Sequence, residues 1–136
     1  MAGVRLYLLD TNIFLELLLD QKESGSVREL LSSKNPEELG ISDLAFHSIG
    51  IILYQKKAAH LFSDFIDDLF GNGGITIFAL GSEDMKRLEQ VSLSFCLDFD
   101  DAYQYVVAEK FNLTLVSFDT DFDRTDRKRI VPADIS

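Results

Sequence analysis

Hydrophobic residues recur along this chain with two spacings, one typical of strands and one typical of helices. Residues 5–10 form an apolar run that predicts a buried strand ending at Asp10, and a helix capped by Asn12 is expected directly after it. Helical spacing returns in residues 26–31, 44–53, 61–70, 82–91 and 98–111, and strand patterns occupy residues 75–80, 113–118 and 130–131. Ser26 and Ser82 are the expected caps of their helices, and residues 71–74 form a break.

The order of these elements predicts the fold class. Strands separated by helices of ten or more residues pair in parallel through right-handed crossovers, so we expect an α/β fold, a three-layer α/β/α sandwich with a central parallel sheet. The chain has 136 residues, of which 46% are hydrophobic. That is enough for one well-filled core and too little for two ordinary domains, so residues 1–136 are expected to form a single domain. In its last long helix, Ala102, Tyr105, Val106 and Phe111 are expected to face inward.

Composition places the protein in a broad class. No window approaches the roughly 18 uninterrupted apolar residues of a membrane span, and the N-terminus lacks the pattern of a secretory signal. A soluble, cytoplasmic protein without a membrane partner is therefore expected. The single cysteine, Cys96, lies between Phe95 and Leu97 and is interpreted as a buried structural thiol.

The distribution of charge is uneven. A formal net charge of −10 argues in general against nucleic-acid binding, because an acidic surface repels phosphate. Two basic clusters stand out against it. Lys56 and Lys57 are interpreted as solvated surface, whereas the second cluster follows closely after an acidic segment, where a surface role and a role beside the acids both remain open. Its members are Arg124, Arg127, Lys128 and Arg129.

Acidic residues follow the predicted strands. Asp10 ends the first strand, Asp119 and Asp121 follow the strand at 113–118, and Asp101 lies in the first turn of the helix before it. Carboxyl ends of parallel strands meet at one edge of a sheet, where two carboxylates about 4 Å apart repel by roughly 4 kcal/mol at a dielectric near 20. Mg²⁺ or Mn²⁺ offsets such repulsion and can activate water for attack on a phosphodiester. The alternative is that these acids are helix caps and surface charges.

Three motifs resemble those of the PIN-domain nucleases, in the same order along the chain. They are Leu8-Leu9-Asp10-Thr11-Asn12, Asp101-Ala102 at a helix start, and the segment from Leu115 through Ser117, Asp119 and Asp121 to Phe122. The resemblance implies a Mg²⁺- or Mn²⁺-dependent endoribonuclease in which Asp10, Asp101, Asp119 and Asp121 hold the metal and orient water. It also implies support from Thr11, Asn12 and Ser117, an RNA substrate, and, because many small members are VapC-type toxins, an antitoxin partner and a homodimer.

One motif departs from the family pattern. The family usually supplies a glutamate early in the helix that here covers residues 44–53, and residues 41–50 contain none. His47 or Ser48 stands about where it belongs, and Asp43 lies one turn earlier. Three interpretations of His47 remain open: a nitrogen ligand favouring Mn²⁺, a proton carrier, or a packed helix residue. The departure, together with eleven phenylalanines, keeps open a second hypothesis, a catalytically weakened or inactive PIN-like module that binds a protein partner.

Overall fold

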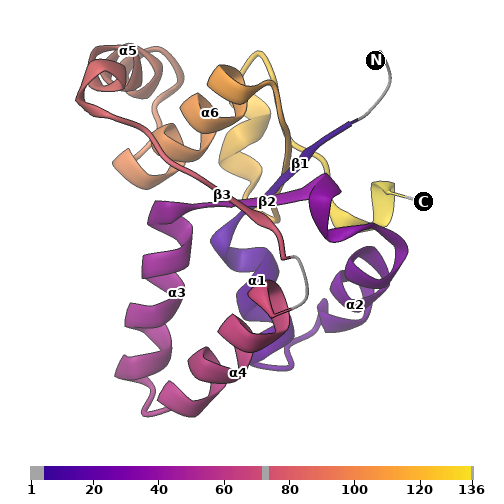
Figure 1. The fold of residues 1–136 in the computed structure, drawn as a ribbon. Coiled ribbons are helices and arrows are strands. Elements are labelled where there is room, and N and C mark those ends of the chain that lie inside the picture. Colours follow the sequence, from indigo (N-terminus) through magenta and orange to yellow (C-terminus); the bar gives the residue numbers. More distant parts are fainter. Residues whose placement is uncertain (1–4, 72–73, 136) are drawn as a thin grey trace.

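The computed structural model describes residues 5–71 and 74–135 and has four parallel strands in one sheet (Figure 1). Their order across the sheet is β3-β2-β1-β4, so β1 lies between the second strand and the last. The strands are short and are β1 (Tyr7–Leu9), β2 (Leu39–Ser42), β3 (Thr76–Phe78) and β4 (Thr114–Val116). Tyr7 of β1 is in register with Leu39 on one side and Thr114 on the other.

Two helices connect each strand to the next. They are α1 (Thr11–Leu18) and α2 (Ser24–Ser33), α3 (Asp43–Gln55) and α4 (Ala59–Phe70), and α5 (Met85–Phe95) and α6 (Phe99–Phe111). Short 3₁₀ segments add η1 (Pro36–Glu38), η2 (Ser82–Asp84), η3 (Thr120–Arg124) and η4 (Pro132–Asp134). The chain steps from β1 to β3 in one direction and then returns to β4, so right-handed crossovers place α1–α4 on one face and α5–α6 on the other. The predicted three-layer α/β/α sandwich is confirmed.

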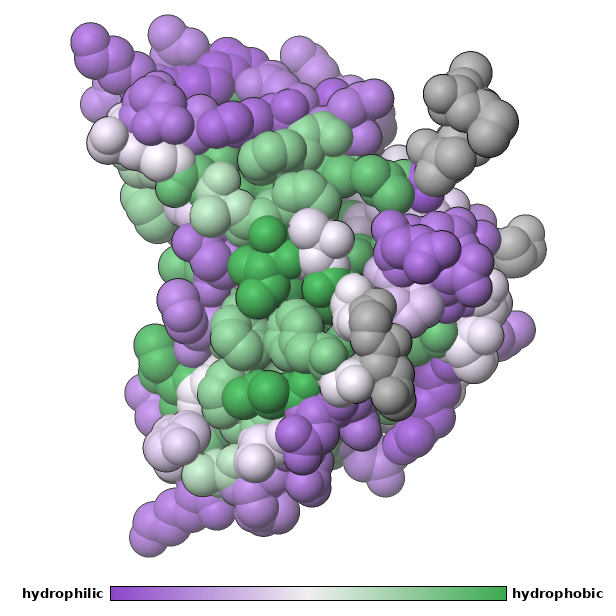
Figure 2. Space-filling view, in the orientation of Figure 1, coloured by the Kyte–Doolittle hydropathy of each residue, from purple (hydrophilic) through white to green (hydrophobic). Residues whose placement is uncertain are grey.

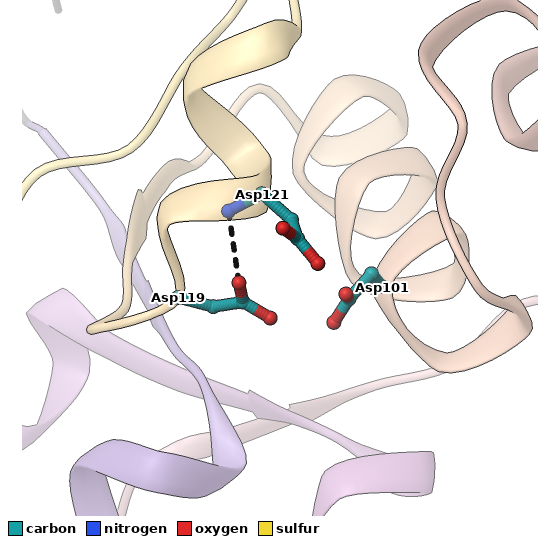
Figure 3. A group of neighbouring side chains, drawn as sticks. All are labelled: Asp101, Asp119 and Asp121. Atoms are coloured by element: carbon teal, nitrogen blue, oxygen red, sulfur yellow. Dashed lines mark hydrogen bonds between the residues drawn. The ribbon is translucent and has the colours of Figure 1, made fainter.

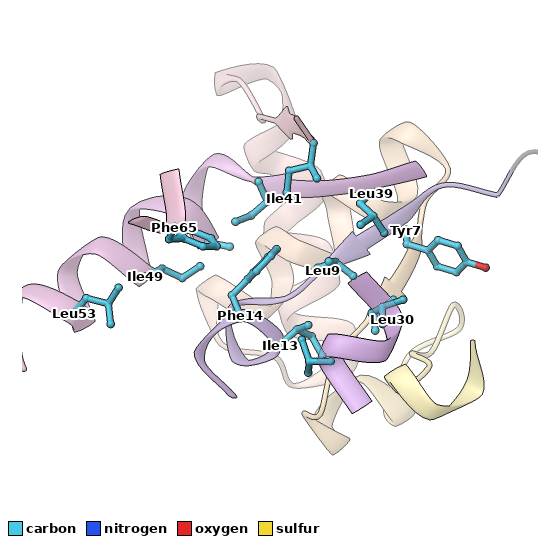
Figure 4. Close-up of a cluster of buried hydrophobic side chains, with 14 residues drawn as sticks. Tyr7, Leu9, Ile13, Phe14, Leu30, Leu39, Ile41, Ile49, Leu53 and Phe65 are labelled. Carbon is cyan, nitrogen blue, oxygen red and sulfur yellow. The ribbon is translucent and has the colours of Figure 1, made fainter. Parts of the chain in front are cut away.

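Each face of the sheet covers its own hydrophobic core. Side chains alternate along β1, so Leu8 packs beneath α5 and α6 while Leu9 packs against α1–α4. In the core on the α1–α4 face (Figure 4), Phe14 and Phe65 meet edge to face with ring centroids 5.2 Å apart. Phe122 of η3 is fully buried in the other core, which anchors the segment after β4. The strand ends are thus fixed from both sides.

Several helix starts differ from the predictions. The cap of α1 is Asp10 rather than Asn12, because β1 stops at Leu9 and the helix begins two residues later. Helix α2 begins at Ser24, and the hydroxyl of Ser26 donates to the Glu23 carbonyl instead of capping. Ser82 lies inside η2, whose cap position is Gly81.

Other local predictions have mixed outcomes. Cys96 is exposed, not buried, because it ends α5 in a left-handed conformation (φ 54°) that turns the chain toward α6. Ala102, Tyr105 and Val106 face inward as predicted, whereas Phe111 at the end of α6 is 37% exposed. Ile130 forms a single parallel bridge with Val116, so the predicted last strand is reduced to one residue. The predicted break begins where Gly71 ends α4, and residues 72 and 73 lie outside the described residues.

The surface over the β3 edge is markedly apolar. Figure 2 shows hydrophobic side chains gathered in a band across the middle of this face. Ile77 of β3 is 44% exposed, and Ile51 and Tyr54 of α3 are exposed more fully. Within residues 5–71 and 74–135, none of the helices combines the length and the apolar character needed to cross a bilayer.

Candidate active site

Asp10 lies where β1 passes into α1. Its amide donates to the Val116 carbonyl of β4 at 3.0 Å, and its Oδ1 accepts from the amide of Thr11 at 2.9 Å. Two further donors reach the same carboxylate: the Ser117 hydroxyl at 2.7 Å and Nε2 of Gln104 at 2.9 Å. Asp10 is only 6% exposed. Burial raises its pKa, while these three hydrogen bonds act in the opposite direction.

Ser117 connects the ends of β1 and β4. Besides donating to Asp10, its hydroxyl oxygen accepts from the side-chain amide of Asn12 at 3.2 Å and from the backbone amide of Asp119 at 3.0 Å. The Asn12 side-chain oxygen accepts from the amide of Phe118 at 3.2 Å. Asn12, which lies inside α1, therefore ties this helix to the segment after β4.

Three carboxylates converge beside this network (Figure 3). Asp101 in the first turn of α6 faces Asp119, at the start of η3, and Asp121 within η3, and one oxygen from each lies within 4.8 Å of the others. Asp119 caps η3, because its Oδ1 accepts from the Asp121 amide at 2.8 Å. Asp121 also accepts from the guanidinium of Arg124 at 3.0 Å. Elements about 20 residues apart in sequence thus present their acids to one point.

A pocket of about 290 Å³ joins Asp101 and Asp119 to Asp10, and Asp121 lies beside it rather than in its lining. Its acidic side carries Asp10, Asp100, Asp101 and Asp119, and its opposite wall is formed by α3. That wall is largely apolar, with Ser48 as its polar member. The remaining lining residues are Thr11, Asn12, Leu15, Leu44, Ala45, Ile52 and Gln104. The acids therefore lie on one side of a cleft rather than around it.

The electrostatics of the pocket favour uptake of positive charge. Burial raises the pKa of Asp101 to about 8, with further contributions from the neighbouring Asp119, Asp10 and Asp100 carboxylates. Such a group binds a proton at neutral pH, because burial and the neighbouring carboxylates both disfavour its ionised form. Oxygens held around one Mg²⁺ at about 2.1 Å lie at most about 4.2 Å apart, so a small side-chain rotation brings the observed trio into range. An all-oxygen donor set of this kind suits Mg²⁺ or Mn²⁺.

The two residues predicted to substitute for an absent acid lie elsewhere. His47 is exposed and lines a separate apolar hollow with Ile51 and Tyr54. Asp43 accepts from the Tyr103 hydroxyl at 2.7 Å and from the Leu44 amide at 2.8 Å. Neither lines the acidic pocket, and the residue of α3 that does is Ser48.

The basic cluster after η3 makes several contacts within the protein. Arg124 donates to the Phe95 and Cys96 carbonyls in addition to Asp121, and Arg129 pairs with Asp123 at 3.1 Å and donates to the Ser117 carbonyl. The Arg127 side chain donates to the side-chain oxygen of Asn112 and to the Leu113 carbonyl. The Lys128 side chain donates to the Asp123 backbone carbonyl. Arg127, Lys128 and Arg129 line a second hollow of about 240 Å³ beside β4. Arg124 thus lies at the acids, and the other three lie along the neighbouring edge.

Comparison with protein families decides the classification. Residues 7–128 match the PIN domain. The chain belongs to the PIN domain family. No curated protein sequence matches it significantly. The matched region of this PIN domain includes all three motifs and every acid of the pocket.

Solved structures show that the PIN fold is shared by distant proteins. A toxin–antitoxin complex from Klebsiella pneumoniae is 17% identical, with a TM-score of 0.73 over 93% of this chain and 97% of that chain. VapC20 of Mycobacterium tuberculosis, a Sarcin-Ricin loop cleaving toxin, is 16% identical, with a TM-score of 0.73 over 86% and 92%. FitAcB from Neisseria gonorrhoeae is 20% identical, with a TM-score of 0.71 over 94% and 99%. At these identities the likeness concerns the fold.

Sequence reasoning overlooked one member of the PIN pocket, Gln104. This residue follows Asp101 by three positions, which places both side chains on one face of α6. The signal available in the sequence is that Gln104 is an amide side chain inside a stretch, residues 102–108, of otherwise apolar and aromatic residues. Asp100 also lines the pocket.

Proposed function

We propose that this PIN domain protein is a metal-dependent endoribonuclease that hydrolyses RNA phosphodiesters in the cytoplasm. The observation that carries the proposal is the convergence of Asp101, Asp119 and Asp121 beside the buried carboxylate of Asp10. Nuclease activity is general in the family to which the chain belongs. The acids supply the donor set that Mg²⁺ or Mn²⁺ requires.

In this proposal, Asp101, Asp119 and Asp121 hold the cation, and Asp10 completes the acidic side of the site. A bound Mg²⁺ or Mn²⁺ would supply activated water and stabilise the negative charge that develops on the phosphate. Ser117 and Asn12 fix the distance between the ends of β1 and β4 through the hydrogen bonds described above. The Thr11 amide helps to keep Asp10 ionised by donating to its Oδ1.

The proposed substrate contacts lie along η3 and the segment after it. The chain is strongly acidic, so phosphate is expected to approach where Arg124, Arg127, Lys128 and Arg129 lower the local negative charge. Arg124 lies beside Asp121, close enough to the acids to face a phosphate there. A toxin with the same fold, VapC20, is a Sarcin-Ricin loop cleaving toxin, which supports RNA as the substrate class.

We further propose that the protein is the toxin of a toxin/antitoxin pair and forms a homodimer. Support for the toxin/antitoxin pair comes from a fold neighbour that is a toxin–antitoxin complex. The apolar band over β3 offers surface that a protein partner could cover. Size-exclusion chromatography with light scattering tests the homodimer directly.

Cleavage of a structured RNA in Mg²⁺ or Mn²⁺ tests the nuclease proposal. We expect cleavage that EDTA abolishes and that Asp101→Asn and Asp119→Asn each reduce by about 100-fold or more, a typical loss for an electrostatic group in an active site. Asp64→Asn, an exposed charge change on α4, is the matched control and should leave the rate unchanged. Cleavage that survives both pocket substitutions would overturn the mechanism.

The second candidate, a weakened or inactive interaction module, has one observation in its favour. The α3 wall of the pocket offers Ser48 and apolar side chains but no carboxylate. Under this hypothesis the protein binds a partner through its apolar surface and cleaves no RNA in either metal. Robust cleavage by the unmodified protein would dispose of it.

A further inference from the structure

Gln104 contacts the candidate site with only one end of its side-chain amide. The residue lies on α6, is 3% exposed, and donates from Nε2 to Asp10 Oδ1 at 2.9 Å. The opposite orientation of the amide would set its oxygen against the Asp10 carboxylate oxygen and would give up this hydrogen bond. The hydrogen bond therefore fixes Nε2 toward Asp10, and Oε1 points away from the Asp10 carboxylate.

The Gln104 Oε1 atom lacks a partner. It is shielded from solvent, and no group in residues 5–71 or 74–135 donates a hydrogen bond to it. It is the single buried side-chain atom of that part of the chain in this condition. A buried acceptor left without a donor costs about 1–3 kcal/mol, so such atoms are usually satisfied by a water, an ion or a ligand.

The surroundings of Gln104 indicate where such a partner would enter. Its neighbours Tyr105, Val106 and Val107 on α6 are buried in the hydrophobic core. On its remaining side Gln104 lines the acidic pocket together with Asp10, Asp101 and Asp119. The pocket is the open space next to the residue, and it is the space in which a cation is proposed to bind.

We propose that Gln104 supplies a neutral oxygen to the cation-binding pocket, as a direct ligand or through one water molecule, while its Nε2 positions Asp10. The inference rests on the metal site of the proposed function and adds a ligand to it. Amide oxygens are ordinary ligands of hard divalent cations. A neutral donor is well suited here, because the pocket already holds the carboxylates of Asp10, Asp101 and Asp119, which repel one another.

Manganese binding without RNA tests this role. Isothermal titration with MnCl₂, supported by the Mn²⁺-induced shift of the thermal midpoint, is compared for the unmodified protein, Gln104→Met and Gln104→Glu. Methionine keeps the length and removes the oxygen, so we expect affinity to fall by about 10-fold, a typical loss for a supporting metal contact. Glutamate keeps an oxygen and adds charge, so we expect affinity to rise.

The opposite signs separate this role from a purely structural one. If Gln104 acted only by donating to Asp10, both variants would lose that donor and both would bind Mn²⁺ more weakly, which would overturn the proposal. Gln90→Met and Gln90→Glu, made at an exposed position of α5, are the matched controls and should leave affinity unchanged. Thermal unfolding in EDTA verifies that each variant is folded.

The same titration keeps this inference distinct from the proposed function. Unmodified protein that binds no Mn²⁺ at millimolar concentration would overturn the metal site itself, and the role of Gln104 with it. Binding that Asp119→Asn weakens but Gln104→Met leaves unchanged would retain the metal site and overturn only the role of Gln104.

Discussion

Replacing Asp101 with asparagine should stabilise the metal-free protein above neutral pH, and this gain should shrink as the pH falls toward about 4. The folded protein raises the pKa of Asp101 from 3.8 to about 8. The folded state therefore holds a proton on this group that the unfolded state has already released, so stability falls as pH rises from about 4 to about 8. Asparagine cannot ionise, and the variant escapes this loss.

The size of the effect follows from the geometry of the cluster. Carboxylate oxygens 4.8 Å apart repel by about 3.5 kcal/mol at an effective dielectric of 20. Asp101 is partly exposed, so solvent screening reduces the gain to about 2–3 kcal/mol, and the lost favourable interaction with the N-terminus of α6 removes about 0.5 kcal/mol. A net gain of about 2 kcal/mol in a chain of this length raises the thermal midpoint by roughly 6–10 °C.

Thermal unfolding in EDTA at pH 5 and pH 8.5 measures this gain. The two midpoints should lie close together at pH 5 and separate widely at pH 8.5, with the asparagine variant higher at both pH values. Asp64→Asn, which changes the net charge equally at an exposed site, should show no such separation. Added Mn²⁺ should stabilise the unmodified protein more than the variant. A constant difference between the two proteins at both pH values would refute the reasoning.

Two further predictions concern the groups that hold the acids in place. Ser117→Ala removes a donor from buried Asp10 and should lower the free energy of unfolding by about 1–3 kcal/mol at pH 7, measured by urea denaturation; an unchanged midpoint would show that Asp10 does not depend on this hydrogen bond. Phe122→Ala removes the fully buried anchor of η3 and should cost about 3–5 kcal/mol in the same assay; a loss below 1 kcal/mol would mean that η3 is held by other contacts.

The acids could be located from sequence because each follows a clear structural boundary. Leu8 and Leu9 are fully buried, and a buried apolar run that ends in Asp10 marks the end of a strand whatever its neighbours are. The same pattern recurs before Asp119. Parallel pairing then brings both strand ends to one edge, so the cluster follows from topology rather than from any single residue.

Features that depend on neighbouring elements were less accessible. Strand β2 was not predicted, because Leu39-Gly40-Ile41-Ser42 is too short to show a period and is defined by pairing with β1 and β3 on both sides. Gly40 is explained only by the fold, since a Cβ there would meet the ring of Phe78 on β3. The choice between His47 and Ser48 depended on the rotation of α3, where one residue is a turn of about 100°. That rotation directs Ser48 toward the pocket and His47 to the exterior.

The position of β1 between β2 and β4 has a consequence for the order of synthesis. Asp10 is made early, yet the hydroxyl that binds its carboxylate belongs to a residue 107 positions later. Because domains fold as their segments leave the ribosome, β1 must wait for β4 before its outer side is paired. A prematurely terminated chain would carry the first acid without its companions, so the acidic cluster exists only in a nearly complete polypeptide.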